Sequence, residues 1–204
     1  MLRTIALAFT AVLGLGLPAA ASGPAVAHTQ SFDFTSGGTL RLHLRAGDVK
    51  IVKGSDPRHI VLRYTAKDSD NGEDASGQVK TQFEVKGSQI EIDLKGRMNG
   101  SCNLDVVVEV PSPINLALRL GAGDVVLDGV QGNIDVQDHV GDITVNPGPE
   151  KQYSLIQAST RIGDLDGMPG PVHGWLGKSG KVTGAGHYRL YAHVGVGDVH
   201  LSFD

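Results

Sequence analysis

The stretch GDVVLDGVQGNIDVQDHVGDITV, residues 123–145, contains three copies of one short pattern. The copies start at Gly123, Gly132 and Gly141, nine residues apart, and each reads Gly, then Asp or Asn, then an aliphatic, a variable and an aliphatic residue. Successive side chains of a strand point to opposite sides, so the two aliphatic residues of each copy share one face. Each unit is therefore predicted to be one strand with a buried aliphatic face, followed by one corner.

The opening Gly-Asp or Gly-Asn pair also recurs outside this stretch. Glycine can adopt the backbone angles of a tight corner, and the side chain that follows it can hydrogen-bond the backbone of the turn. The predicted turn motif comprises Gly47, Asp48, Gly123, Asp124, Gly132, Asn133, Gly141, Asp142, Gly163, Asp164, Gly197 and Asp198. Because one unit cannot bury its aliphatic face alone, stacking of these units predicts an all-β, single-domain β-solenoid.

The spacing of the copies predicts how the coils stack. If two units make one coil, Asp124 and Asp142 lie on the same corner of successive coils and Asn133 lies on the opposite corner. Asp164 is then the next same-corner residue, twenty-two residues after Asp142, and the four extra residues are assigned to an outward loop at 146–150.

Period-two alternation, without a sustained helical period, covers the rest of the chain. In the first half it predicts antiparallel strands and hairpins at residues 39–52, 60–66, 79–85, 89–94 and 104–110, with a hairpin turn at 86–88 and a surface loop at 67–78. Residues 167–186 are predicted to be rich in loops, with a turn at 177–181 and a strand at 181–183, before strands at 187–194 and 199–203.

The N-terminus predicts export from a bacterial cytoplasm. Arg3 precedes an apolar run at 5–17, followed by Pro18 and three alanines, which is the pattern of a cleaved signal peptide. Cleavage is expected after Ala21, with Ala27 as the alternative, and no cysteine is placed to accept a lipid. The expected organisation is a signal peptide at 1–21, a flexible segment at 22–30 and one domain at 31–203, without a transmembrane segment after cleavage, in the periplasm or at the cell surface.

Composition narrows the classes of partner. Without Arg3 the chain has 17 basic and 22 acidic residues, a net charge of −5 spread along its length, which argues against nucleic acid. Cys102 is the one cysteine, so stability comes from packing and not from an intramolecular disulfide. We interpret Cys102 as a small buried residue beside a turn, with an exposed, cross-linking thiol as the alternative.

The chain also resembles the bacterial putative adhesin family, a β-strand-repeat domain of unknown function. The resemblance rests on Val110-Pro111, on the LGAGDV sequence at 120–125 and on the Gly-Asp ladder, and covers residues 31–203. It implies a superhelical β-fold similar to that of pectin-lyase-like proteins, and the family carries no known catalytic residues.

Two other classes of function remain open. A calcium-stabilised envelope β-roll would bind the ion at Asp124, Asp142 and Asp164, although calcium repeats have a different Asp position and these residues fit turn caps better. A carbohydrate-active enzyme would use outward acids such as Asp128 and Asp135, but ten aromatic residues with one tryptophan, Trp175, offer little platform for sugars.

No catalytic, cofactor or metal-binding motif is found among the nucleophiles and histidines. The histidines are scattered, although His187 and His193 meet if their strands pair. The sequence therefore predicts a non-enzymatic interaction module without a cofactor, whose partner is an envelope or cell-surface protein or a glycan. Recognition is expected on solvent-facing strand positions including Val126, Asp135 and Thr144.

Overall fold

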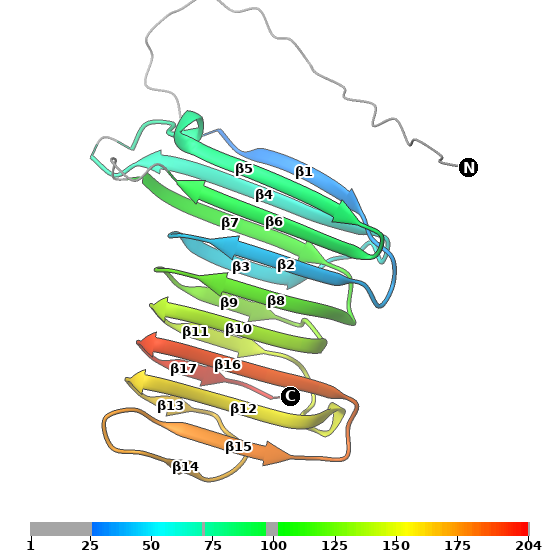
Figure 1. The fold of residues 1–204 in the computed structure, drawn as a ribbon, viewed down its shortest axis with the longest axis vertical. Helices are drawn as coiled ribbons and strands as arrows, with labels where there is room; N and C mark the ends of the chain where they lie inside the picture. The colour runs from blue at the N-terminus through cyan, green and yellow to red at the C-terminus, as the bar shows by residue number, and fades with distance from the viewer. Residues whose placement is uncertain (1–25, 71, 97–101, 204) are drawn as a thin grey trace, which may run out of the picture.

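The computed structural model describes residues 26–70, 72–96 and 102–203, and this part of the chain forms two mixed β-sheets that face each other (Figure 1). Sheet A has eight strands, in the order β1 (His28–Asp33), β4 (His59–Asp68), β7 (Cys102–Val110), β3 (Asp48–Lys53), β9 (Val125–Asp128), β11 (Ile143–Asn146), β17 (Val199–Leu201) and β13 (Leu165–Asp166). Sheet B has nine, in the order β14 (Val172–His173), β15 (Ser179–Thr183), β12 (Tyr153–Ile162), β16 (Tyr188–Val196), β10 (Gly132–Val140), β8 (Ile114–Leu120), β2 (Thr39–Leu44), β6 (Gln89–Gly96) and β5 (Val79–Lys86). Helix in these ranges is confined to the 3₁₀ turns η1 (Ser76–Gln78) and η2 (Glu150–Gln152), as the sequence predicts.

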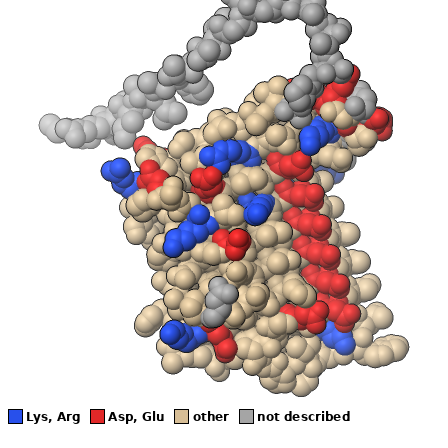
Figure 2. Space-filling model, turned by 180° about the vertical axis from the view of Figure 1, so that it is seen from behind, with Lys and Arg blue, Asp and Glu red and all other residues tan. Residues whose placement is uncertain are grey.

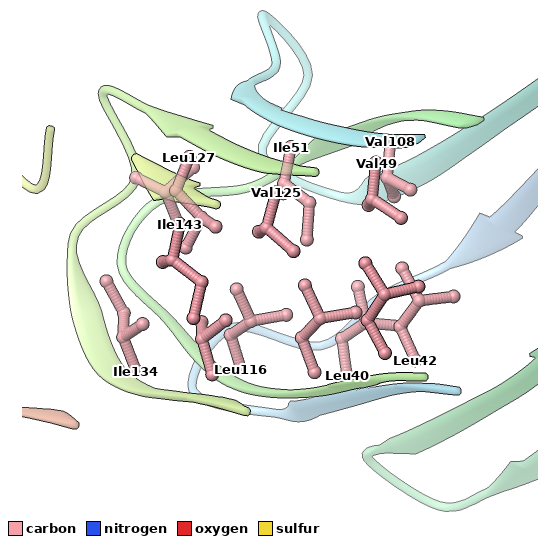
Figure 3. Packing of buried hydrophobic residues seen from close by; sticks show 14 of the residues in the cluster. Leu40, Leu42, Val49, Ile51, Val108, Leu116, Val125, Leu127, Ile134 and Ile143 are labelled. Atoms are coloured by element: carbon pink, nitrogen blue, oxygen red, sulfur yellow. The ribbon is translucent and has the colours of Figure 1, made fainter. Parts of the chain in front are cut away.

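The repeated unit is a strand in sheet B, a corner at Gly-Asp, and a strand in sheet A. Alternate side chains of each strand point between the sheets, where aliphatic residues of β3, β9 and β11 face those of β2, β8 and β10 (Figure 3). Val125, Leu127 and Ile143 have no exposed surface, and Ile134 is 1% exposed. The predicted inward face of the nine-residue pattern is confirmed, and its burial is the main source of stability because no disulfide is present in the described residues.

The strand pairs do not stack in chain order. The pair β2–β3 lies between β6–β7 and β8–β9, and the pair β16–β17 lies between β10–β11 and β12–β13. Asp198 therefore follows Asp142 on the same corner, and the prediction that Asp164 comes next is wrong. The connection from β11 to β12, residues 147–152, is longer than the link 129–131 from β9 to β10, so the extra residues lie where the loop at 146–150 was predicted, with Asn146 ending β11 and Glu150 beginning η2.

The N-terminal half differs in part from the predicted antiparallel strands. Residues 39–52 form two strands in different sheets, because Gly47 turns the chain at the corner, and β2 and β3 pair only with parallel neighbours. The hairpin β5–β6 is confirmed, and β4 is antiparallel to both β1 and β7. β1 begins at His28, so strand structure enters the segment 22–30 that the sequence assigned to a flexible terminus.

The C-terminal layers end in short strands. β15 covers the predicted strand at 181–183 but begins at Ser179, so the predicted turn at 177–181 is wrong over its last three residues. β15 pairs antiparallel with β12, and β14 pairs antiparallel with β15 at the edge of sheet B. The predicted signal peptide at 1–21 lies outside the described residues, and no helix in the described ranges is long and apolar enough to cross a bilayer.

A candidate binding groove on sheet B

Three connected depressions lie on the outer face of sheet B, and together we call them the outer groove. The first, of about 570 Å³, lies over β2, β8, β10 and β16, and the second, of about 320 Å³, lies over β10, β16 and β12. They share Asp135 and Tyr191. The third, of about 230 Å³, extends to β15 and shares Gln157 with the second. Because His173 of β14 also lines the third depression, the outer groove crosses seven neighbouring strands, from β2 to β14, along the long axis of the molecule.

A ladder of asparagine side chains fixes one wall of the first depression. Asn115 Nδ2 donates to the carbonyl oxygens of Gly37 and Gly38 at 2.9 and 3.2 Å, and Asn133 Nδ2 donates to Asn115 Oδ1 at 2.8 Å. Asn133 Oδ1 then accepts the backbone N–H of Arg189 at 3.1 Å. These bonds hold β2, β8, β10 and β16 in register, so the wall is rigid, and Ala117 leaves room beside it.

The outer groove carries an excess of positive charge. Asp135 is its one acidic lining residue, and Arg119 binds both carboxylate oxygens, with Nη1 3.1 Å from Oδ1 and Nη2 2.6 Å from Oδ2. Three further cations line the depressions: Arg41, Arg189 and Lys181. Their side chains form no ion pair or hydrogen bond with a described residue, although Glu91 is the register neighbour of Arg41.

One aromatic ring and one hydroxyl–imidazole pair lie along the outer groove. Tyr191 lines the first two depressions, between Asp135 and Gln157 in the cross-strand register. Ser159 Oγ lies 2.9 Å from His193 Nδ1, and within the described ranges no acidic group bonds the second nitrogen of this imidazole. Both side chains line the second depression, where they are available for contact with a ligand.

The opposite corner holds a ladder of aspartates, seen as a continuous acidic band along one edge of the molecule (Figure 2). Each Oδ1 accepts the backbone N–H of the next aspartate, at 2.7–3.0 Å. The order is Asp48, Asp124, Asp142, Asp198 and Asp164. Asp at this position was predicted to bond its own turn, and it bonds the next layer instead.

The predicted calcium residues belong to this ladder. Asp124 and Asp142 are adjacent rungs, whereas Asp164 lies beyond Asp198. The Oδ1 atoms of Asp124 and Asp142 accept backbone N–H groups, and Asp164 donates its own N–H to Asp198. No group of three His, Cys, Asp or Glu suited to a metal is found in the described ranges. The geometry accounts for these carboxylates as connectors between layers.

The three residues predicted to form one recognition face lie on two faces. Val126 and Thr144 are register neighbours on the outer face of sheet A, whereas Asp135 lies in the outer groove on sheet B. Asp128, the other candidate acid, is on sheet A and accepts a hydrogen bond from Asn146 Nδ2 at 3.4 Å. Asp128 and Asp135 therefore do not converge as a catalytic carboxylate pair requires.

Two further sequence predictions concern His187, His193 and Cys102. His187 precedes β16 and His193 lies within it, so they cannot meet by strand pairing. Cys102 is half-buried against the core, opposite Asp68, and burial raises the pKa of its thiol. This agrees with its interpretation as a packing residue.

A buried carboxylate that the sequence analysis did not single out lies beside the aspartate ladder. Asp138 is 2% exposed, its Oδ1 accepts the backbone N–H of Val140 at 3.3 Å, and its Oδ2 has no hydrogen-bond partner in the described residues. Burial raises the pKa of this carboxyl group. Leu120 and Val194 are its register neighbours, so an apolar row surrounds it.

Comparison with known proteins supports the fold. No protein-family model and no curated protein matches the sequence. The structure is similar to that of a putative cell adhesion protein from Clostridium sporogenes, with a TM-score of 0.54 and 12% identity, covering 88% of this chain and 100% of that chain. Putative adhesins from Bacteroides fragilis (TM-score 0.26, 10% identity, 87% and 97% coverage) and Parabacteroides distasonis (0.30, 14%, 87% and 75%) are more distant. At these identities the similarity shows the fold alone.

Proposed function

We propose that this chain is an exported, non-catalytic β-solenoid that acts as an adhesion-type interaction module at the bacterial cell envelope, and that it binds its ligand in the outer groove. The signal-peptide pattern supports export. The strand–corner–strand layers support the solenoid, and the first structural neighbour carries the description of a cell adhesion protein. Stacked layers of this kind create extended surfaces suited to binding.

The continuity of the outer groove is the observation that carries this proposal. The outer face of a sheet that packs on one side is ordinarily covered by solvated polar side chains. Here three depressions join across seven strands, and a hydrogen-bonded asparagine ladder fixes the wall of the first. A preformed wall lowers the entropic cost of binding, which favours recognition of an extended ligand.

The test compares a filled groove with a filled control face. Ala117→Trp places a large ring in the first depression, and Thr144→Trp places the same ring on the exposed outer face of sheet A. Binding of the purified mature chain to whole bacterial cells is measured for both variants, with thermal unfolding to confirm that each is folded. We expect Ala117→Trp to weaken binding about tenfold or more and Thr144→Trp to leave it within about twofold.

Equal loss in the two variants, or no loss with Ala117→Trp, would overturn the assignment of binding to sheet B. Export is tested separately by fractionation of cells that produce the full chain. The mature chain is expected outside the cytoplasm, and a chain that stays in the cytoplasm at full length contradicts this part of the proposal.

A further inference from the structure

Acidic and basic side chains are unevenly distributed between the aspartate ladder and the outer groove. The chain has a formal net charge of −4, yet the lining of the outer groove carries three cations against one carboxylate, and Arg119 already binds that carboxylate. The aspartate ladder gathers exposed acids at the corner instead (Figure 2). An anion approaching this acidic protein therefore finds its attraction in the outer groove.

The spacing of the cations fits a linear ligand. Arg41 on β2 and Arg189 on β16 are three strand spacings apart in sheet B, about 14 Å, and Lys181 on β15 is two further spacings away, about 10 Å. Both guanidinium groups are without a partner among the described residues. A guanidinium presents a fork of donors that matches a carboxylate, so charged groups repeated along one chain would be bound at intervals.

The groups between the cations suit sugar rings. The exposed wall is formed by Asn115, Asn133 and Thr39. Beyond their ladder bonds, Asn133 Nδ2 keeps one N–H and the amide oxygens of Asn115 and Asn133 each keep a lone pair, and with the Thr39 hydroxyl these can bond sugar hydroxyls. Tyr191 supplies a ring between the first two depressions, on which an apolar sugar face can stack. Nucleic acid would require closely spaced cations and several aromatic platforms, which the lining of this groove does not provide.

We propose that the outer groove binds a linear acidic polysaccharide, with uronic-acid carboxylates on Arg41 and Arg189 and one sugar ring on Tyr191. This inference rests on the function proposed above and adds the class of ligand. Lys181 extends the contact toward β15, so longer oligosaccharides bind more tightly than short ones.

The test measures binding of defined oligosaccharides to the mature chain by calorimetry at low salt. The probes are oligogalacturonate and a neutral galactan oligomer of the same length. The variants Arg41→Gln and Arg189→Gln each remove one anchor, and Lys50→Gln removes the same charge from the outer face of sheet A, where Lys50 is exposed. We expect each arginine variant to lower the affinity for oligogalacturonate about tenfold or more and Lys50→Gln to change it less than about twofold.

Two more measurements separate stacking and charge. Tyr191→Phe should retain the affinity that Tyr191→Ala loses, because stacking needs the ring and not its hydroxyl. The neutral oligomer should bind at least about tenfold more weakly than oligogalacturonate, and added NaCl should reduce this difference.

Other outcomes overturn the inference in distinguishable ways. If the neutral oligomer binds as tightly as oligogalacturonate and the arginine variants have no effect, the ligand is not an acidic polysaccharide. The outer groove is still the binding site in that case if Ala117→Trp blocks binding. If polyphosphate or single-stranded oligothymidylate binds more tightly than oligogalacturonate, the ligand belongs to the class of phosphate polyanions and not to the acidic polysaccharides. Failure of every oligosaccharide, together with unchanged cell binding by Ala117→Trp, overturns both proposals.

Discussion

Replacement of Gly141 by alanine tests the corner geometry that sets the spacing of the layers. Gly141 has φ +143°, and an added Cβ would lie 1.8 Å from the carbonyl oxygen of Gly123 and 2.8 Å from Asp138 Oδ2. The backbone conformation costs an L-residue about 1–3 kcal/mol. Overpacking against a fixed backbone costs about 1–3 kcal/mol more. We therefore expect Gly141→Ala to lower the free energy of unfolding by about 2–6 kcal/mol, out of a total of about 5–15 kcal/mol.

Two glycine controls separate these contributions in urea unfolding of the mature chain. Gly37 has φ +78° with open space around it, so Gly37→Ala reports the backbone contribution alone. Gly77 has open space without a positive φ, so Gly77→Ala should be neutral or stabilising by up to about 1 kcal/mol. A loss in Gly141→Ala no larger than that in Gly37→Ala would show that the adjacent layer yields freely, which refutes the close packing argued for this corner.

Three further predictions concern the buried acid, the ladder and the inserted layer. Because the pKa of Asp138 is raised in the folded state, the protonated carboxyl group stabilises the fold below the ordinary aspartate pKa, and this stability is lost as the pH rises through the folded-state pKa. Asp138→Asn should therefore be more stable than the wild type by about 1–3 kcal/mol at pH 8 and should lose this advantage near pH 4. Urea titrations at both pH values measure the difference. Asp142→Asn keeps an acceptor for the N–H of Asp198 but removes one negative charge from the aspartate ladder. Its free energy of unfolding should therefore rise by about 0.5 kcal/mol at low salt. If the increase persists in about 1 M NaCl, repulsion between the aspartates is not its cause. Removal of residues 187–204 deletes β16 from the interior of sheet B and β17 from the interior of sheet A. Urea unfolding of this truncated chain, followed by circular dichroism, should therefore lose its cooperativity. A transition as sharp as that of the full mature chain would refute the observed layer order.

The sequence predicts the repeated unit well because its determinants are local. Alternation of aliphatic residues sets the buried face, and the glycine at each corner is required by φ values that other residues rarely adopt. The layer order is a different matter. Every parallel layer presents the same aliphatic face and the same Gly-Asp corner, so β2–β3 and β16–β17 fit between other layers as well as at the ends. The preference is decided by contacts between residues far apart in the chain, such as Asp48 with Asp124 and Asn133 with Arg189.

The candidate site was harder to predict for the same reason. Arg41 and Arg189 come from the two inserted strand pairs. Their location in the same groove can therefore be predicted only when the layer order is known. The alternation of apolar and polar residues in the sequence does predict that each of these arginines lies on the outer side of its strand. Alternation predicts that Val126, Asp135 and Thr144 face solvent, but it does not say which sheet each strand joins, so it cannot separate Val126 and Thr144 on sheet A from Asp135 on sheet B.

The two side-chain ladders explain how one chain combines a fixed frame with a variable surface. Aspartates at one corner connect neighbouring layers through bonds to backbone N–H groups, and asparagines at the other do so through backbone groups and the Asn133–Asn115 side-chain bond. The core residues fill the space between the sheets. Asn115 and Asn133 are themselves outward residues of sheet B, but other outward residues such as Arg41 and Tyr191 belong to neither ladder, so those positions can change without loss of the frame. One corner is lined by aspartates and the opposite corner by neutral asparagines, and Arg41 and Arg189 lie beside this neutral wall without an ion-pair partner in the described residues. The acidic polysaccharide that we propose as the ligand would be repelled by the aspartate edge and attracted to the outer groove, so the residues that set the register of the layers would also set its orientation.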